Sequence, residues 1–168
     1  LSTYERYVSS SLAAAVLRLR EACTRDEEDL EDLEADEFGF AEELDNDSRP
    51  RRRYRPAQDR ELADIVHGLD IDRLESEDSK FNTLRKVLDL YFTGTFASQN
   101  PSHKVVNFSF FRGAIDYLER RLRAEGIRLV RIDGSVPSLP NDPERDERAR
   151  RIAEFREDPD IQVLLTSE

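Results

Sequence analysis

The chain lacks several residue types, and these absences exclude whole classes of protein. It has 168 residues, with no tryptophan, no methionine and a single cysteine, Cys23. One cysteine excludes an internal disulfide and a zinc site built from cysteines, and it fits a reducing cytoplasm. No run of about 18 apolar residues occurs, and no basic segment followed by an apolar one opens the chain. We therefore expect a cytoplasmic protein with no membrane partner.

The chain is also poor in apolar residues. Hydrophobic residues make up 38%, charged residues another 38%, and the mean hydropathy is -0.72. An average globular domain is about 45 to 50% apolar, so part of this chain is not core. Its length suits one domain, or a domain with an appendage, because two lobes need roughly 100 to 200 residues each. Since the chain begins at Leu1 and contains no methionine, we interpret it as a piece of a longer protein.

The net charge of -11 is concentrated in one segment. Residues 26–47 contain thirteen acidic and no basic side chains, and removing their charge of -13 leaves +2 on the remainder. Prolines interrupt the basic cluster that follows. This cluster comprises Arg49, Arg51, Arg52, Arg53 and Arg55. A charged segment with few apolar residues buries too little apolar surface to offset the conformational entropy lost on folding. Residues 24–57 are therefore predicted to be a disordered linker or insertion. The arginines form either a phosphate-binding patch or, as we favour, a solvated arm neutralised by its acidic neighbour.

Helices are predicted on both sides of this linker. In the segment 1–23, apolar residues recur at helical spacing: Leu12, Val16, Leu19 and Cys23. The segment 58–102 is predicted to be a helical lead-in with two helices. The shorter helix contains Leu62, Ile65 and Val66. The longer helix begins at Asp78 and Ser79 and ends before Gly94, and it has one apolar face: Phe81, Leu84, Val87, Leu88 and Tyr91.

The remainder, 103–168, alternates between strand and helix patterns. Residues 105–110 form a near-continuous apolar run, typical of a strand covered on both faces. A helix ending at Gly126 follows, and 127–132 and 161–166 are two further buried strands. Between these two, Asp142 and Pro143 are predicted to start a helix. Its inward residues would be Ala149, Ile152 and Phe155. Short connections of this kind predict an α/β fold with a parallel sheet and right-handed crossovers.

Ligands of open parallel sheets bind beyond the carboxyl ends of the strands. This rule selects three places in the chain: 109–112, 133–135 and 166–168. Each place offers small or hydroxylated residues, whose backbone N–H groups and hydroxyls suit a phosphate. The same residues also commonly serve only to close turns, so this pattern alone does not identify a function.

The order of four segments and their amino-acid sequences carry more information. The chain reads KVVNFSFF, RLVRIDGS, DERARRIAEF and VLLTSE in succession, and DSKFNTLRKVL precedes them. This succession resembles the second, C-terminal RecA-like lobe of superfamily-two helicases and translocases, in particular the chromatin-remodeller-like branch that translocates on DNA. The resemblance covers about 103–168, more weakly from 78, and ends at the start of the fifth motif. It implies a partial RecA-like (P-loop NTPase-like) half-lobe and a parent that binds ATP and DNA and hydrolyses ATP.

The resemblance also implies roles for individual residues. Ser109, Phe110 and Arg112 match the fourth motif, which lies near the nucleic-acid backbone. The matches in the later motifs are Asp133, Gly134 and Ser135 in the following turn, Arg148 in the helix, and Thr166 and Ser167 at the start of the fifth motif. All nine residues are therefore predicted to contact nucleic acid, and we expect them to contact the DNA backbone rather than the bases.

The chain lacks the parts of such a motor that perform chemistry. It contains no GxxxxGK[ST] phosphate loop and no identifiable acidic magnesium box, and His67 and His103 are too isolated for a metal pair. We expect no catalytic residue, metal or cofactor in this chain, and no ATP hydrolysis by it alone. ATP and magnesium are implied for the parent, together with a first RecA-like lobe as partner and an arginine finger beyond residue 168.

Two alternatives remain open. The chain is a free-standing α/β binding or interaction module without catalysis if the strand-end residues merely close turns. The other alternative is a small nucleotide- or phosphate-handling enzyme of flavodoxin-like build, although the chain lacks a glycine-rich phosphate loop and a nucleophile paired with histidine. We favour the motor fragment.

Overall fold

The computed structural model describes residues 11–24, 60–99, 102–139 and 145–167. The chain forms two compact units, Leu1–Asp78 and Ser79–Glu168. Most of the predicted linker, residues 25–57, lies outside the described residues, and the domain boundaries given above stay a prediction. None of the described helices is both long and apolar enough to cross a membrane.

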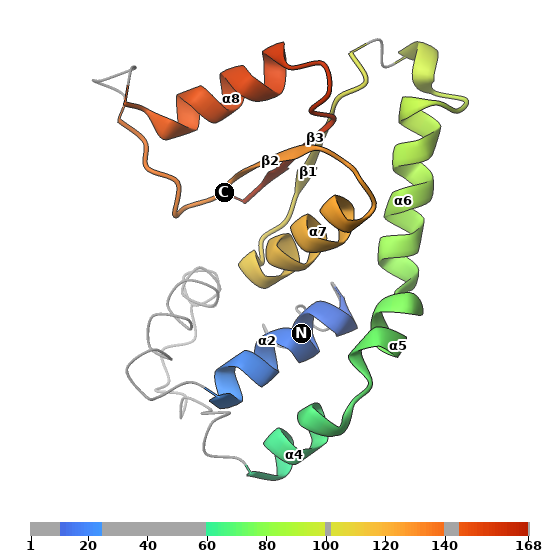
Figure 1. The fold of residues 1–168 in the computed structure, drawn as a ribbon, viewed down its shortest axis with the longest axis vertical. Coiled ribbons are helices and arrows are strands. Elements are labelled where there is room, and N and C mark those ends of the chain that lie inside the picture. Colours follow the sequence, from blue (N-terminus) through green and yellow to red (C-terminus); the bar gives the residue numbers. More distant parts are fainter. Residues whose placement is uncertain (1–10, 25–59, 100–101, 140–144, 168) are drawn as a thin grey trace, which may run out of the picture. The chain divides into compact units, whose positions relative to one another are not determined.

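The first unit contains three described helices, coloured blue to green in Figure 1: α2 (Leu12–Thr24), α4 (Arg60–Gly68) and α5 (Ile71–Ser76). Arg20 of α2 ties α2 to the end of α4. Its guanidinium donates to the carbonyl oxygens of Val66 (2.6 Å), His67 (3.1 Å) and Leu69 (2.5 Å). A cation at a helix C-terminus satisfies carbonyls that have no partner within the helix.

The predicted helix in the segment 1–23 forms, but its inward face differs from the prediction. The buried residues of α2 are Ala13, Ala14, Ala15 and Val16, whereas Leu12 is exposed. The small alanine side chains allow close packing, and α2 contacts both α4 and α5.

The second unit is built on an all-parallel sheet. Its elements in chain order are α6 (Ser79–Phe92), η2 (Ala97–Gln99), β1 (Val105–Phe108), α7 (Arg112–Ala124), β2 (Leu129–Ile132), α8 (Glu147–Glu157) and β3 (Val163–Thr166). The strand order is β1-β3-β2, and β3 pairs with both neighbours. The predicted α/β fold class with a parallel sheet is confirmed, and the topology is consistent with a RecA-like half-lobe.

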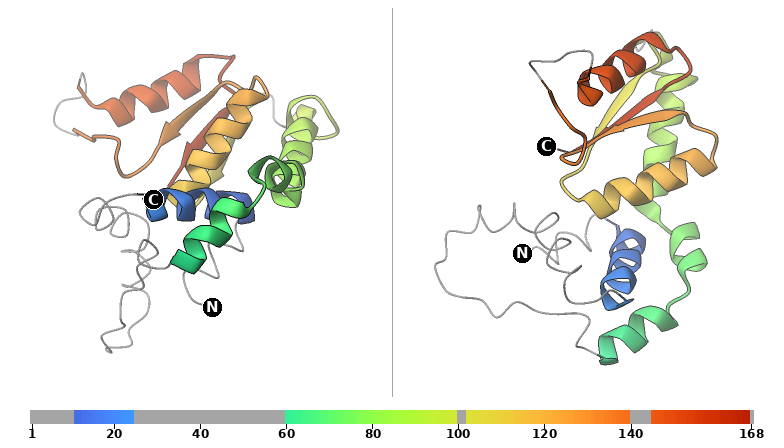
Figure 2. Two further views of the ribbon diagram at one scale, coloured as in Figure 1. Left: turned by 60° about the horizontal axis from the view of Figure 1, so that its bottom comes forward. Right: turned by 60° about the vertical axis from the view of Figure 1, so that its left-hand side comes forward.

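The two helices of the crossovers cover opposite faces of the sheet (Figures 1 and 2). The connections through α7 and α8 run in opposite directions across the sheet, so crossovers of one hand place their helices on opposite faces. On the α8 face, Val130 and Ile132 of β2 form a core cluster with Phe155 and Ile161. Since side chains alternate along a strand, Val163 and Leu165 of β3 point to the α7 face, and both are fully buried.

The end of α7 is fixed by contacts between residues close in sequence, and the start of β1 by contacts between residues distant in sequence. Gly126 adopts a positive φ of 79°, and the N–H groups of Gly126 and Ile127 donate to the carbonyls of Arg123 and Leu122 (both 3.0 Å). This is the helix ending that the glycine predicted. Near the start of β1, the Lys104 ammonium donates to the carbonyls of Asp158 (2.7 Å) and Ile161 (2.9 Å).

Helix α6 packs against α7 within the same unit. The Phe81 and Tyr117 rings meet edge to face at 6.1 Å, and the Arg121 guanidinium lies 4.1 Å from the centre of the Phe81 ring. The predicted helix is confirmed, but its buried residues are Phe81, Leu88 and Phe92. Val87 and Tyr91, which we expected on the inward face, are exposed.

The prediction that the strand at 105–110 is covered on both faces is wrong. Along β1, half-buried residues alternate with exposed ones, and Val106 and Phe108 are exposed. Both β1 and β2 are edge strands, and the reason for the difference is that α8 packs against β2. A continuous apolar run therefore does not guarantee a strand buried on both sides.

Helix α8 also departs from its prediction. It runs from Glu147, and the side chain of Asp146 caps it by accepting from the Ala149 N–H (3.0 Å). Asp142 and Pro143, the predicted start, lie outside the described residues. Phe155 points inward as expected, whereas Ala149 and Ile152 are exposed.

Candidate functional site

The structure brings the carboxyl ends of all three strands together. The backbone N–H of Ser109, after β1, donates to the carbonyl of Thr166 in β3 (3.0 Å). The N–H of Ser167, after β3, donates to the carbonyl of Ile132 in β2 (3.2 Å). The three places selected from the sequence therefore form one continuous rim, with the end of β3 in the middle. We call this edge, formed by residues 109–112, 133–135 and 166–167, the strand-end rim.

The β2 end of the rim is a turn organised by Asp133. Its carboxylate is buried and accepts hydrogen bonds from the Ser135 N–H (2.9 Å), the Ser135 hydroxyl (2.5 Å) and the Arg131 Nε (2.5 Å). An aspartate that bonds the backbone two residues ahead stabilises such a turn. Burial alone would raise the pKa of Asp133, but the hydrogen bonds from Ser135 and Arg131 outweigh it and hold the pKa below its ordinary value.

Arg131 connects this turn to α7. Its guanidinium contacts the carboxylates of Asp116 and, at 3.2 Å, Glu119, besides its bond to Asp133. Burial acts to lower the pKa of Arg131, but Asp116 and Asp133 more than compensate and raise it. The group therefore remains a cation and neutralises the buried carboxylate. The sequence analysis did not identify this role, because nothing in the local pattern shows that Arg131 points toward α7.

Arg148 of α8 holds the same turn from the other side. Its Nη2 lies within hydrogen-bond distance of the carbonyls of Asp133 (3.3 Å) and Val136 (3.4 Å). The Arg148 Nε is buried without a hydrogen-bond partner in the described structure. Arg148, predicted to contact nucleic acid, therefore directs its side chain at the turn backbone. Gly134 and Ser135, at the tip of the turn, are exposed.

The β1 end of the rim is more open. Phe110 is among the most exposed aromatic residues described, and its ring meets that of Phe108 edge to face at 4.9 Å. The Ser109 hydroxyl accepts from the Phe111 N–H (3.3 Å), and Arg112 begins α7, whose first turn has no acidic residue. Phe108 is exposed, contrary to the strand covered on both faces that was expected here.

The central part of the rim is the end of β3. The Thr166 hydroxyl donates to the Ser167 carbonyl (2.9 Å), and both residues are half-buried. The predicted site residues thus fall into two groups. The first group is exposed or half-buried, although the hydroxyls of Ser135 and Thr166 are bonded within the rim: Ser109, Phe110, Arg112, Gly134, Ser135, Thr166 and Ser167. The second, Asp133 and Arg148, has its polar groups engaged within the turn.

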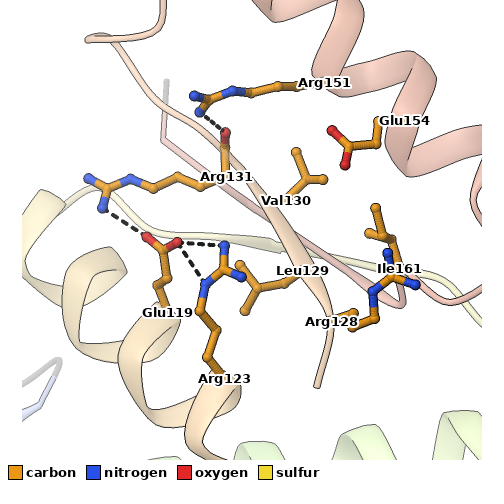
Figure 3. Close-up of a pocket in the computed structure, with 9 residues that line it drawn as sticks. All are labelled: Glu119, Arg123, Arg128, Leu129, Val130, Arg131, Arg151, Glu154 and Ile161. Carbon is orange, nitrogen blue, oxygen red and sulfur yellow. Dashed lines mark hydrogen bonds and ion pairs between the residues drawn. The ribbon is translucent and has the colours of Figure 1, made fainter. Parts of the chain in front are cut away.

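A groove of about 480 Å³ lies along the outer edge of β2 (Figure 3). Four arginines line it, but each one is already paired. Arg131 and Arg123 both contact Glu119, as Figure 3 shows, and Arg151 donates to the carbonyl of Arg131 (2.7 Å) and contacts Glu147. Arg128 is held by two aspartates of the loop that follows α8. Because carboxylates neutralise these cations, the groove is a weaker candidate for a phosphate site than its arginines suggest.

The implied magnesium has no cluster of ligands among the described residues. Within 11–24, 60–99, 102–139 and 145–167, no group of three histidine, cysteine or acidic side chains is placed to hold a metal ion. The carboxylate of the strand-end rim, Asp133, is engaged in its turn.

Comparison with known proteins gave limited information. No family model matches the sequence, and no curated protein matches it. Among solved structures, the C-terminal part of the Fun30 ATPase domain is similar, with 20% sequence identity and a TM-score of 0.43. The match covers 97% of this chain and 54% of that structure, so the chain spans about half its length. A likeness at this TM-score does not establish a shared function.

Proposed function

We propose that this chain supplies part of the second motor lobe of an ATP-dependent nucleic-acid helicase or translocase. In this role the strand-end rim contacts the sugar-phosphate backbone of the track, for which we propose DNA. The observation that carries the proposal is the convergence of the three strand ends, joined by the bonds from Ser109 to Thr166 and from Ser167 to Ile132. The succession of four motifs in the sequence supports the same assignment.

The chemistry of the rim suits a phosphate backbone. Ser109, Ser135 and Thr166 carry hydroxyl groups that would exchange their present hydrogen bonds within the protein for bonds to phosphate. Backbone N–H groups at strand and helix ends are also common phosphate donors. Arg112 adds a cation at the start of α7, where the helix dipole is also positive. Such contacts position a strand without reading its sequence, which is what movement over arbitrary sequence requires.

The proposal extends to the nucleotide bound by the parent protein and to the compartment of the cell. ATP and magnesium would be bound with the help of a first RecA-like lobe, so this chain alone is expected to lack ATPase activity. The low cysteine content supports a reducing compartment, and we propose the cytoplasm.

The proposal is tested by measuring nucleic-acid binding of the whole chain. We expect a fluorescein-labelled 20-nucleotide DNA to show increased anisotropy at low salt, with an affinity that falls as salt rises. Arg112→Ala should weaken binding and reduce the slope of log affinity against log salt by about 0.7 to 0.9, the loss of one phosphate contact. Arg123→Ala is the matched control, since it removes the same charge from the other end of α7, where Arg123 pairs with Glu119.

A variant lacking residues 26–47 should be measured in parallel, because their charge of -13 repels DNA. If neither this variant nor the whole chain binds DNA at low salt, the proposal is wrong. Equal effects of Arg112→Ala and Arg123→Ala would also contradict it, because they would indicate a general effect of charge. Absence of binding would favour the alternative α/β interaction module, which the exposed apolar residues of β1 also suit.

A further inference from the structure

One face of the sheet is only half covered. On the α8 face, the strands pair so that Val106 and Phe108 of β1 lie in the same rows as Leu164 and Thr166 of β3. The β2 half of this face is buried under Phe155 of α8. In contrast, Val106 is 57% exposed, Phe108 48% and Phe110, just beyond the strand, 71%. Exposed apolar side chains that adjoin one another are candidates for a binding surface.

The two phenylalanines form an ordered pair at the rim. Their ring centres are 4.9 Å apart and the ring planes make an angle of 89°. In this edge-to-face arrangement, one ring supports the other and still leaves aromatic surface open. Among the described residues, nothing covers most of the Phe110 ring, so the fold itself does not account for its apolar surface.

The surroundings of this pair favour a ligand that combines a flat apolar face with an anion. Phe110 directly follows Ser109, whose N–H is bonded to the end of β3. Two residues later, Arg112 begins α7, which has no acidic residue in its first turn. An apolar ring surface beside positive potential complements one unit of a single nucleic-acid strand, which carries a base and a phosphate. A duplex suits the pair less well because its bases already stack on one another.

We propose that Phe110, supported by Phe108, stacks on an unpaired base of a nucleic-acid strand whose phosphates lie along the strand-end rim. This inference rests on the proposed function and adds the substrate class, a single strand. Stacking on an aromatic side chain tolerates any base, because every base has a flat face. Phe110→Ala is expected to weaken binding of a single-stranded oligonucleotide about tenfold, and Phe110→Tyr to retain most of it.

The absence of tryptophan allows a direct test of stacking. In Phe110→Trp, the new indole is the sole tryptophan of the chain, and we expect single-stranded oligothymidine to quench its fluorescence. A blunt duplex of the same length should quench it much less. Phe96→Trp is the control, because Phe96 is also partly exposed but packs against Tyr91 at the end of α6, outside the rim. Its fluorescence should not change.

Anisotropy of a labelled oligonucleotide, recorded in the same titration, separates this inference from the proposed function. Binding without quenching, together with unchanged affinity in Phe110→Ala, would overturn stacking and leave the proposed function intact. No binding would overturn both. Equal quenching by the duplex would contradict the preference for unpaired bases. A blue shift that depends on protein concentration without DNA would assign the surface to a second copy of the chain and also overturn stacking.

Discussion

The two ends of the strand-end rim differ in how their polar and apolar groups are used. At the β2 end, the Asp133 carboxylate, the Arg131 guanidinium and the Arg148 side chain are all bonded within the protein. At the β1 end, Phe110 leaves most of its ring exposed. Residues that match one family pattern therefore serve different purposes. Some hold the rim in shape, and others are available to a ligand.

This difference changes how substitutions at the rim should be interpreted. A variant of Asp133 or Arg148 disturbs the turn that presents Gly134 and Ser135, so a loss of binding would be indirect. A variant of Phe110 leaves the internal contacts of the rim in place. Stability measurements separate the two cases.

Of the two ends of the rim, the β2 end should show the larger effect on stability. Asp133→Asn removes the charge that Arg131 neutralises and weakens the hydrogen bonds to Ser135. The free energy of unfolding should therefore fall by about 2 kcal/mol. Urea unfolding followed by circular dichroism measures the change. Asp116→Asn, in the same network but half exposed, should cost less than about 1 kcal/mol. If both variants cost the same, burial of Asp133 is not what makes the β2 end rigid.

The same carboxylate predicts a dependence on pH. Because the pKa of Asp133 is lower in the folded chain than in the unfolded one, ionised Asp133 stabilises the fold above the unfolded pKa of about 3.9. This contribution is lost as the pH falls from there through the folded pKa. The stability difference between the native chain and Asp133→Asn should therefore be constant from about pH 7 to pH 5 and shrink below about pH 4. A difference that persists to pH 2 would show that charge is not involved.

The smallest effect on stability is expected at the open end. Phe110→Ala removes a side chain that is mostly in solvent, and the free energy of unfolding should change by less than about 0.5 kcal/mol. Phe155→Ala, which empties a buried position under α8, should instead cost about 3 to 4 kcal/mol. Thermal or urea unfolding of both variants makes the comparison. A large loss in Phe110→Ala would mean that the ring is buried by residues outside the described ranges.

Much of the second unit was predictable from the sequence. Short apolar runs marked the three strands, Gly126 marked the end of α7, and Phe155 marked the inward face of α8. The convergence of the strand ends followed from the rule that parallel strands end at the same edge. These predictions succeeded because each depends on local pattern or on a general topological rule.

The features that could not be predicted depend on which helices and strands are neighbours in the fold. The exposure of Val106 follows from α8 packing on the β2 half of the sheet, and the order β1-β3-β2 is not encoded in any local pattern. The start of α8 was misplaced because Asp142 followed by Pro143 and Asp146 followed by Glu147 are both acceptable helix starts. The internal role of Asp133 could not be predicted, because it depends on Arg131 reaching its carboxylate and Arg148 reaching its carbonyl.

The position of β3 has a consequence for the order of folding. Among the described strands it is the central one of the sheet and the last in sequence, so β1 and β2 have no described strand to pair with until it forms. Val163 pairs with Val105 on one side and with Leu129 on the other. Each pairing therefore closes a long loop of the chain. Loop closure of this kind is slow relative to helix formation. During synthesis, helix α7 can form early, whereas the sheet, and with it the rim, forms only after residue 166 has left the ribosome.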